Sequence, residues 1–539
     1  NQSRLKTLSE KHKAQDIEIY TNERAIRARN VLQQTGDVEA NYVIPAGSMI
    51  IPNLQPEAPL IAAILEFDAD IIESVLAEER LRNLKDGSSI MYDTTAFNLT
   101  MMYGLEAVTV PSNLEVGLKE WSPQNISIKT NPEAIIWAVD GVDDNSVAFA
   151  ARLMEKGVEV RIIDKEALLS KQSLSRGSIA VLAMDNPEYE DLSETVNSIA
   201  SDLDISVLSI ESGFGAEELP DWGGRHFRLL ERPQIAILSQ SGFSSYDVGV
   251  SWWSLDHHLG IRHSQIDASL VNYADLRRYN TIILPSGYRD MGEYEKKVLS
   301  DWMEQGGTLI AHAASSSALA SEQGIGSVKL LQNTFEESEK YNISLQRELS
   351  ALYEELDIES VNSNKVDLDT AYPWEQSEGK YPPSQLEYRD NWQSIFMPSG
   401  AFVSGRTDQE HWLTFGTNST LPLLYRSYPV LMSDDSSEAP IRVGVFSDSA
   451  KANTYSTINW SDIPPGKELN VRMSGLLWPE AAQRIANSAY LTRDRIGKGQ
   501  LILFSGEPNF RGATLGTNRV WLNAVVYGAG LGTEPRINP

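Results

Sequence analysis

Apolar and polar positions alternate most regularly between residues 281 and 320. Residues 281–284 and 308–311 form two short apolar runs, which predict buried strands. Between these runs, apolar side chains recur at helical spacing and predict a helix with one apolar face; they are Tyr294, Val298, Leu299, Trp302 and Met303. A strand, a covering helix and a second strand are the parts from which parallel sheets are built.

The same alternation of short strands and helices predicts two α/β units. In the first unit, a helix at 145–156 is flanked by apolar runs at 134–139, 158–163, 178–183 and 205–209. We expect this unit to be a small open sheet built from βαβ units. The second unit begins with a strand at 234–238, and its later strands resume at 400–403, 441–446 and 500–504.

Two other parts of the chain depart from this alternation. The first 35 residues predict a polar helix, and residues 335–356 predict a charged helix that a polar segment follows. Near residue 95, Tyr92, Phe97 and Met101 predict buried packing. The predicted division is an N-terminal α+β linker or docking region at 1–125, a small α/β domain at 130–228, a discontinuous α/β domain at 232–330 plus 390–539, and a helical insertion at 331–389.

Composition narrows the classes of partner. The 539 residues include 74 acidic and 46 basic side chains, and the resulting net charge of -28 repels phosphate backbones and anionic membranes. We therefore expect no nucleic-acid binding. No stretch of about 18 uninterrupted apolar residues occurs, so we also expect no membrane span. Cysteine is absent, which excludes disulfides, thiolate metal sites and a cysteine nucleophile.

After the apolar run at 308–311 come His312, Ala313, Ala314 and Ser315, where α/β folds mount a nucleophile on a strand-to-helix elbow. Alanines occupy this elbow. A serine hydrolase that uses His312 with a serine of residues 315–317 is one interpretation. Serines after a strand more commonly cap helices, so we interpret the elbow as vestigial and expect no catalytic residue there.

Three histidines form the densest group of possible metal ligands. His257, His258 and His263 lie near Asp256 and Asp267, and imidazole and carboxylate groups bind zinc. Adjacent residues on a helix point about 100 degrees apart, so His257 and His258 cannot both face one ion without distortion. The helix dipole also favours histidines at a helix C-terminus. We therefore expect no metal and no cofactor in this chain.

A last group of candidates surrounds the final predicted strand and its helix. Its members are Glu507, Asn509, Arg511 and Arg519, which can either bind a ligand or tie the backbone together. Three tryptophans could add a flat platform for a peptide or a sugar; they are Trp252, Trp253 and Trp412. Pockets of this kind lie at the carboxyl ends of parallel strands.

Several segments, taken in chain order, resemble the C-terminal region of large bacterial zinc carboxypeptidases of the carboxypeptidase A-like metallopeptidase family. The segments are YVIPAGSMIIPNLQPEA, MYDTTAFNLTMMYGL, RPQIAIL, YNTIILPSGY, WMEQGGTLIA, HWLTFG, VRMSGLLWPE and GKGQLILFSGEPNFRG with TNRVWLNAV. The resemblance implies a class I glutamine amidotransferase-like C-terminal domain with a flavodoxin-like parallel sheet. It also implies an upstream peptidase domain and a periplasmic or secreted location.

The chain departs from this family's pattern at both of its chemical sites. The motif that supplies zinc ligands and a general-base glutamate has no counterpart, so zinc is expected only in the missing peptidase domain. The amidotransferase-like cysteine would stand at Ala313 or Ala314. We therefore expect a non-catalytic accessory region whose partner is its own upstream peptidase domain, with a homo-oligomer also possible. Two alternatives stay open: a module that binds a peptide or a sugar, and a serine-dependent hydrolase of amidotransferase-like fold.

Overall fold

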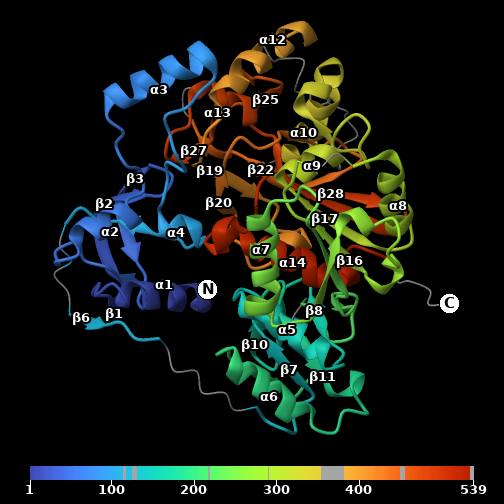
Figure 1. Cartoon of the computed structure of the whole chain (residues 1–539). Helices are drawn as coiled ribbons and strands as arrows, with labels where there is room; N and C mark the ends of the chain where they lie inside the picture. The colour runs from blue at the N-terminus through green and yellow to red at the C-terminus, as the bar shows by residue number, and fades with distance from the viewer. Residues whose placement is uncertain are drawn as a thin grey trace, which may run out of the picture.

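The structure is a computed structural model that describes residues 1–112, 114, 117–123, 130–215, 219–288, 291–353, 381–449 and 456–534. Figure 1 shows an N-terminal part, a second part beneath it and a large C-terminal part, which surround helix α14 (Leu515–Leu531). The chain is a mixed α/β protein of several parts, as the sequence predicts at this level.

The largest sheet has twelve strands and joins two distant stretches of the chain. Its main path runs through β15 (His263–Asp267), β14 (Ile235–Ser239), β16 (Thr281–Leu284), β17 (Thr308–His312), β29 (Gly499–Phe504), β28 (Ala489–Ile496), β22 (Glu438–Val443), β19 (Ala401–Thr407) and β20 (Thr420–Tyr425). The first five strands are parallel. The predicted strand, helix and strand between residues 281 and 311 are confirmed as β16, α8 (Glu293–Glu304) and β17.

The second half of this sheet is antiparallel, which corrects the expectation of a parallel sheet. The reason is the short connection between β28 and β29, which consists of Gly497 and Lys498 alone. Gly497 has a φ of +58°, as tight hairpin turns require. A two-residue turn can join only antiparallel strands, because parallel strands need a long crossover.

Shorter elements lie around this sheet. The helices are α7 (Ser245–Trp253), α9 (Ala313–Leu319), α10 (Ser338–Tyr353), α12 (Pro383–Gln393) and α13 (Pro479–Ile485). Three short strands complete the sheet; they are β18 (Lys329–Leu330), β21 (Leu431–Met432) and β27 (Arg472–Ser474). Two separate two-stranded sheets pair β23 (Val445–Asp448) with β26 (Lys467–Asn470) and β24 (Ser456–Ile458) with β25 (Ser461–Ile463). Leu345 and Leu349 of the predicted apolar stripe on α10 are buried, whereas Leu352 is 52% exposed and Leu356 lies outside the described residues.

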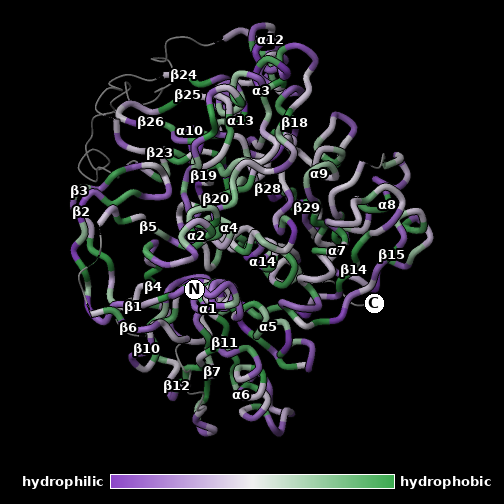
Figure 2. The backbone as a smooth tube through the Cα atoms, turned by 60° about the vertical axis from the view of Figure 1, so that its left-hand side comes forward, coloured by the Kyte–Doolittle hydropathy of each residue, from purple (hydrophilic) through white to green (hydrophobic). Residues whose placement is uncertain are grey.

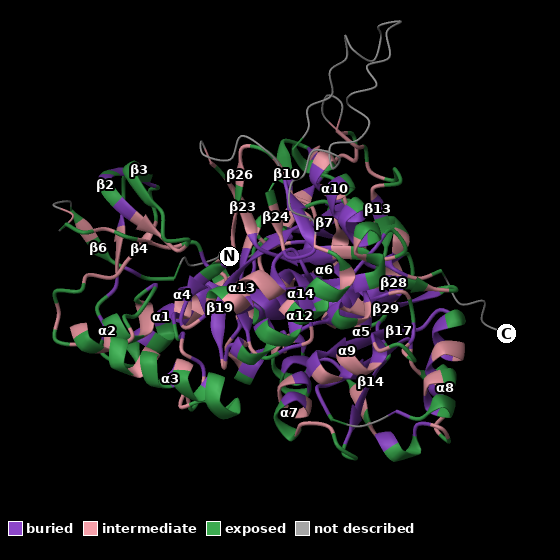
Figure 3. Cartoon of the chain, turned by 90° about the horizontal axis from the view of Figure 1, so that it is seen from above, coloured by how far each residue is buried: buried purple, intermediate pink, exposed green. Residues whose placement is uncertain are grey.

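Helix α14 is the central element of the molecule and is buried along nearly its whole length (Figure 3). It contacts β16 and β17 of the large sheet and also α5 (Asn145–Glu155) and α4 (Leu99–Met102). Its first turn approaches the backbone after α4 so closely that a Cβ atom on Gly516 would lie 2.9 Å from the Cα of Gly104. Among the described helices, none is both long and apolar enough to cross a membrane.

The second part of the chain contains a five-stranded sheet. Its order is β12 (Leu208–Ile210), β7 (Ile136–Val139), β11 (Ile179–Leu182), β8 (Arg161–Ile163) and β13 (Phe227–Leu229). All four neighbouring pairs are antiparallel, so the expectation of βαβ units is wrong. Between β8 and β11 the chain forms the hairpin of β9 (Ala167–Leu169) and β10 (Gln172–Leu174) in place of a crossover helix. The other helix of this part is α6 (Leu192–Asp202).

The N-terminal part also differs from the prediction. Helix α1 covers only Gln2–Lys13, and residues 26–33 form β2 (Ile26–Gln33), which pairs with β3 (Val38–Ile44). Ile26 and Ala28 are buried between exposed neighbours, which is the period of a strand and not of a helix. In Figure 2 this hairpin is mostly hydrophilic. The remaining elements are β1 (Tyr20–Asn22), β4 (Met49–Ile50), β5 (Val108–Thr109), β6 (Leu118–Glu120), α2 (Ala58–Leu65) and α3 (Glu73–Asp86).

Candidate functional site

The strand-to-helix elbow that the sequence predicts is present at the end of β17. His312 is the last residue of the strand, and α9 begins directly with Ala313. Ala313 is buried and has a φ of +44°, in the left-handed region that side chains rarely adopt. The backbone therefore has the sharp turn that α/β hydrolases use to present a nucleophile, with a methyl group in the place of one.

His312 is bound on both sides of its ring. Its Nδ1 lies 3.0 Å from Oδ2 of Asp247, and the indole Nε1 of Trp521 donates a 2.8 Å hydrogen bond to its Nε2. Because the indole Nε1 of Trp521 can only donate, Nε2 of His312 must accept, so the ring proton is on Nδ1, which donates a hydrogen bond to Oδ2 of Asp247. Asp247 also accepts from the backbone amide of Ser286. Neither ring nitrogen of His312 is left to activate a serine.

The serines after the elbow are likewise used by the fold. The hydroxyl of Ser315 donates to the carbonyl of Pro285 at 2.6 Å, and that of Ser316 donates to the carbonyl of Phe504 at 2.7 Å. These two bonds fasten α9 to the ends of β16 and β29. Ser317 faces a cavity.

A cavity of about 840 Å³ opens in front of the elbow, and we call it the strand-end cavity. Ala313, Ala314 and Glu507 line it beyond the ends of β17 and β29. Residues from other parts of the chain complete its wall, including Tyr92, Asp93, Tyr288, Arg426, Tyr428 and Arg484. Pockets at the carboxyl ends of parallel strands are the usual ligand sites of open α/β sheets.

Two ionisable groups at the strand-end cavity, Glu507 and Tyr428, have pKa values that burial and neighbouring charges raise. Burial, together with the nearby charge of Asp247, raises the pKa of Glu507. Burial and the charge of Glu507 raise the pKa of Tyr428 well above its ordinary value. The hydroxyl of Tyr428 is buried beside the backbone of Glu507 and has no hydrogen-bond partner of good geometry among the described residues. Arg426 is the cation whose charge acts on both groups. A buried hydroxyl without a partner and an arginine at one cavity are groups that a polar ligand can satisfy.

Gly506 permits this arrangement. It lies between Ser505 and Glu507 at the end of β29, and a Cβ atom on it would come within 2.8 Å of Cε2 in Tyr428. The ring of Tyr428 can therefore approach the strand end only because residue 506 has no side chain.

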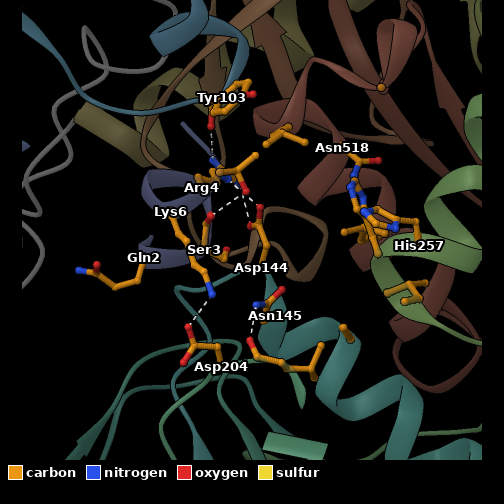
Figure 4. Close-up of a pocket in the computed structure, with 18 of the residues that line it drawn as sticks. Gln2, Ser3, Arg4, Lys6, Tyr103, Asp144, Asn145, Asp204, His257 and Asn518 are labelled. Carbon is orange, nitrogen blue, oxygen red and sulfur yellow. Dashed lines mark hydrogen bonds and ion pairs between the residues drawn. The ribbon is translucent and has the colours of Figure 1, made fainter. Parts of the chain in front are cut away.

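A second cavity, of about 860 Å³, lies between α1, α5, α7 and α14, and we call it the junction cavity. Figure 4 shows Arg4 and Asp144 on one side of it and His257 and Asn518 on the other. Arg4 makes two bonds to Asp144, of 2.7 and 2.8 Å. Burial opposes ionisation of Asp144, but Arg4 and Arg519 outweigh it and lower the pKa of Asp144 to about 2.

The structure places three predicted aromatic residues at this junction cavity. The rings of Trp253 and His257 stack with centroids 4.8 Å apart, and His258 meets Trp253 edge-on at 4.4 Å. Nδ1 of His258 lies 2.9 Å from Nδ2 of Asn518, and burial lowers the pKa of His258 to about 4. Trp252, on the same helix, is 48% exposed, and Trp412 lies in a short helix after β19.

The candidate metal ligands are not brought together. His258 is bound to Asn518, whereas Nδ1 of His263 lies 3.5 Å from Oδ1 of Asp256. Within the described parts of the chain, no three histidine, aspartate or glutamate side chains converge as a metal-binding group.

The four candidates near the last strand have different roles. Glu507 lines the strand-end cavity, and Arg511 forms a 2.8 Å ion pair with Asp93. Asn509 is buried and donates to the hydroxyl of Ser254 at 2.5 Å. Arg519 is fully buried and donates to the backbone carbonyls of Asp143 and Gly141. Asn509 and Arg519 therefore tie parts of the fold together. The sequence pattern alone leaves open whether they do this or bind a ligand.

Most residues of the strand-end cavity are not among the candidates that the sequence pattern indicates. Tyr92 and Phe97 were expected to be buried, but they are 101% and 51% exposed, and only Met101 is buried. Tyr92 precedes Asp93, whose carboxylate pairs with Arg511, and this pair holds the loop at the cavity. Arg426 and Tyr428 lie more than 100 residues from the elbow in sequence, so no local motif connects them to it.

Comparison with known proteins adds little. No family model and no curated protein matches the chain. Among solved structures, the chain is similar to a β-galactosidase from Bacillus circulans sp. alkalophilus, at 12% identity and a TM-score of 0.28, over 66% of this chain and 38% of that one. It is also similar to an exo-β-1,4-mannosidase from Opitutaceae bacterium strain TAV5, at 10% identity and a TM-score of 0.25, over 56% of this chain and 36% of that one.

A ThuA-like protein from Bacteroides uniformis is similar at 11% identity and a TM-score of 0.25, over 55% of this chain and 93% of that one. The chain thus spans 38% and 36% of the length of the two glycosidases. TM-scores this low assign neither a fold nor a function.

Proposed function

We propose that this chain is a non-catalytic binding region, and that its strand-end cavity holds a polar ligand of the peptide or sugar class. The observation that carries the proposal is Ala313, which occupies the nucleophile's place on a left-handed elbow in front of a cavity of about 840 Å³. The site has the architecture of an active site, with a methyl group at the position where such elbows carry the nucleophile.

The chemistry around the elbow supports binding over hydrolysis. Both ring nitrogens of His312 and the hydroxyls of Ser315 and Ser316 are used in buried hydrogen bonds. The serine-dependent hydrolase is therefore the less favoured alternative. The cavity in turn offers a buried tyrosine hydroxyl, a carboxyl group with a raised pKa and an arginine, which suit an uncharged polar ligand.

The finer fold assignment is part of the same proposal. Numbered along the chain, the five parallel strands lie in the order 2-1-3-4-5, which is the order of flavodoxin-like sheets. This order supports a class I glutamine amidotransferase-like domain, which the sequence resemblance implies. The antiparallel strands β28, β22, β19 and β20 would then be an extension of that domain.

The parent protein is also a proposal. The ordered resemblance supports an accessory region of a zinc-carboxypeptidase-like protein, exported to the periplasm or secreted, which docks on its own upstream peptidase domain. Sedimentation of this chain with a separately expressed peptidase domain tests the docking. A common sedimenting species is expected, and independent sedimentation of the two proteins would overturn this part of the proposal.

The binding role is tested by a thermal-shift screen with short peptides and with mono- and disaccharides, followed by titration calorimetry of each hit. We expect Arg426→Ala and Tyr428→Phe to weaken binding about tenfold or more, because each removes a hydrogen-bonding group, a loss of about 1.4 kcal/mol. Arg495→Ala is the control, since Arg495 is exposed and pairs with Glu534. Hits that bind these variants as tightly as the unaltered chain would refute the site.

A further inference from the structure

Four tyrosine side chains stand almost completely in solvent at or beside the carboxyl edge of the parallel strands. Tyr92 is 101% exposed, Tyr288 99%, Tyr273 87% and Tyr246 85%. Tyr92 and Tyr288 line the strand-end cavity itself. Large aromatic side chains usually bury most of their surface, so four fully exposed rings near one edge require an explanation.

Three of these tyrosines follow three neighbouring strands. Tyr273 comes after β15, Tyr246 is the second residue of α7 after β14, and Tyr288 comes after β16. Since β15, β14 and β16 are adjacent in this order, the segments that carry the three rings follow the same order toward the cavity. Neighbouring strands are about 4.8 Å apart, so the ends of these three strands span about 10 Å beside the cavity.

Hydrogen bonds join the loops that carry these rings. The amide of Tyr288 donates to the carbonyl of Gly242 at 3.2 Å, and the amide of Ser244 donates to the carbonyl of Ser286 at 2.8 Å. On the other side, the hydroxyl of Ser241 donates to Asp267, the last residue of β15, at 2.9 Å. The three loops therefore form one connected edge.

The surroundings of the rings indicate the kind of ligand. Tyr246, Tyr273 and Tyr288 are carried by three separate segments, and Leu270, which is 55% exposed, is a further large apolar side chain on the turn of Tyr273. Contiguous apolar patches mark many protein–protein contact surfaces, whereas these rings stand on separate segments. Separate flat rings can instead stack on the C–H faces of successive sugars. Nucleic-acid bases also stack on tyrosine, but a net charge of -28 repels their phosphates.

We propose that a neutral carbohydrate chain lies along this edge, with one end in the strand-end cavity and successive sugars on Tyr288, Tyr246 and Tyr273. The inference rests on the proposed function and specifies the ligand as an oligosaccharide. It predicts that affinity increases with chain length, because each added sugar reaches a further ring.

Titration calorimetry with neutral gluco-, xylo-, manno- and galacto-oligosaccharides of increasing length tests this inference. For the series that binds, we expect the Kd to fall about tenfold or more from disaccharide to hexasaccharide. The double variant Tyr246→Ala and Tyr273→Ala should lose this gain and still bind the disaccharide normally. Tyr388→Ala is the matched control, because Tyr388 is 80% exposed on α12 and should not affect binding.

Equal affinity for all lengths, a gain that survives in the double variant, or no binding by any series would each overturn the inference. Failure of the proposed function is a different result: no ligand of either class would then bind in a way that depends on Arg426. A peptide whose binding requires Arg426, with no response to any carbohydrate, would keep the binding role and reject the carbohydrate edge.

Discussion

Nε1 of Trp521 donates a 2.8 Å hydrogen bond to Nε2 of His312, and both side chains are almost wholly buried. Trp521 belongs to the central helix α14, and His312 is the last residue of β17. The bond therefore ties the helix to the strand that carries the elbow. It also uses the ring nitrogen that a catalytic histidine would need for proton transfer.

Trp521→Phe should destabilise the protein. The variant leaves Nε2 of His312 buried without a partner, which costs about 1–3 kcal/mol of unfolding free energy. Urea denaturation should show a lower midpoint with an unchanged m-value. Trp252→Phe is the control, since Trp252 is 48% exposed, and it should stay within about 0.5 kcal/mol. Equal effects of both substitutions would contradict the role of this bond.

Ala313→Gly should be neutral or slightly stabilising, by up to about 1 kcal/mol, because glycine adopts a positive φ without strain. Ala318→Gly, in the last turn of the same helix, should instead cost up to about 1 kcal/mol. Thermal unfolding of the two variants measures the difference. Similar losses in both would mean that residue 313 is an ordinary helical position and that the elbow is not strained.

Arg519→Met should be strongly destabilising, by about 3–5 kcal/mol, because it removes a fully buried cation from Asp144 and from two backbone carbonyls. Chemical denaturation of this variant is compared with Arg495→Met, in which an exposed pair with Glu534 is lost. That control should cost less than about 1 kcal/mol. A small effect at Arg519 would show that α14 and the second part of the chain are not coupled through this side chain.

Asp144 should contribute stability that depends on pH. Its pKa of about 2 in the folded chain is below the ordinary value of 3.8, so the contribution is complete above about pH 4 and disappears as the pH falls toward 2. Relative to the unaltered chain, Asp144→Asn should lose about 2 kcal/mol at neutral pH. Denaturation midpoints across this range should converge at acid pH, and a constant difference would contradict the ion pair as its cause.

Glu507→Gln should stabilise the protein at neutral pH, whereas Asp144→Asn should destabilise it. Burial and Asp247 raise the pKa of Glu507, so its ionisation destabilises the fold as the pH rises through that raised value. The variant should therefore have a higher melting temperature than the unaltered chain at neutral pH, and the two should converge below about pH 4. Glu534→Gln, at an exposed position, is the control. A lower melting temperature at neutral pH would mean that the Glu507 carboxylate has a stabilising partner.

Local pattern predicted the parallel strands and the elbow well. Apolar runs of four or five residues specify β16 and β17, and the position of Ala313 follows directly from the end of β17. The predicted parallel strand direction in the five-stranded sheet is wrong, because strand pairing depends on contacts between residues that are distant in sequence. The same limit applies to the cavity, since Arg426 and Tyr428 reach the elbow only through the fold. The prediction that Tyr92 is buried is wrong, because aromatic residues are usually buried and the sequence carries no signal that this side chain is exposed.

The most direct test of a non-catalytic binding region measures binding and ligand integrity in one sample. The chain is titrated with the best ligand from the screen, incubated at saturation, and the ligand is recovered for mass spectrometry. We predict binding of one ligand per chain, loss of affinity in Arg426→Ala, and recovery of the ligand unchanged. Time-dependent cleavage of the ligand that Ser317→Ala abolishes, or binding that is unaffected by Arg426→Ala, would contradict the account.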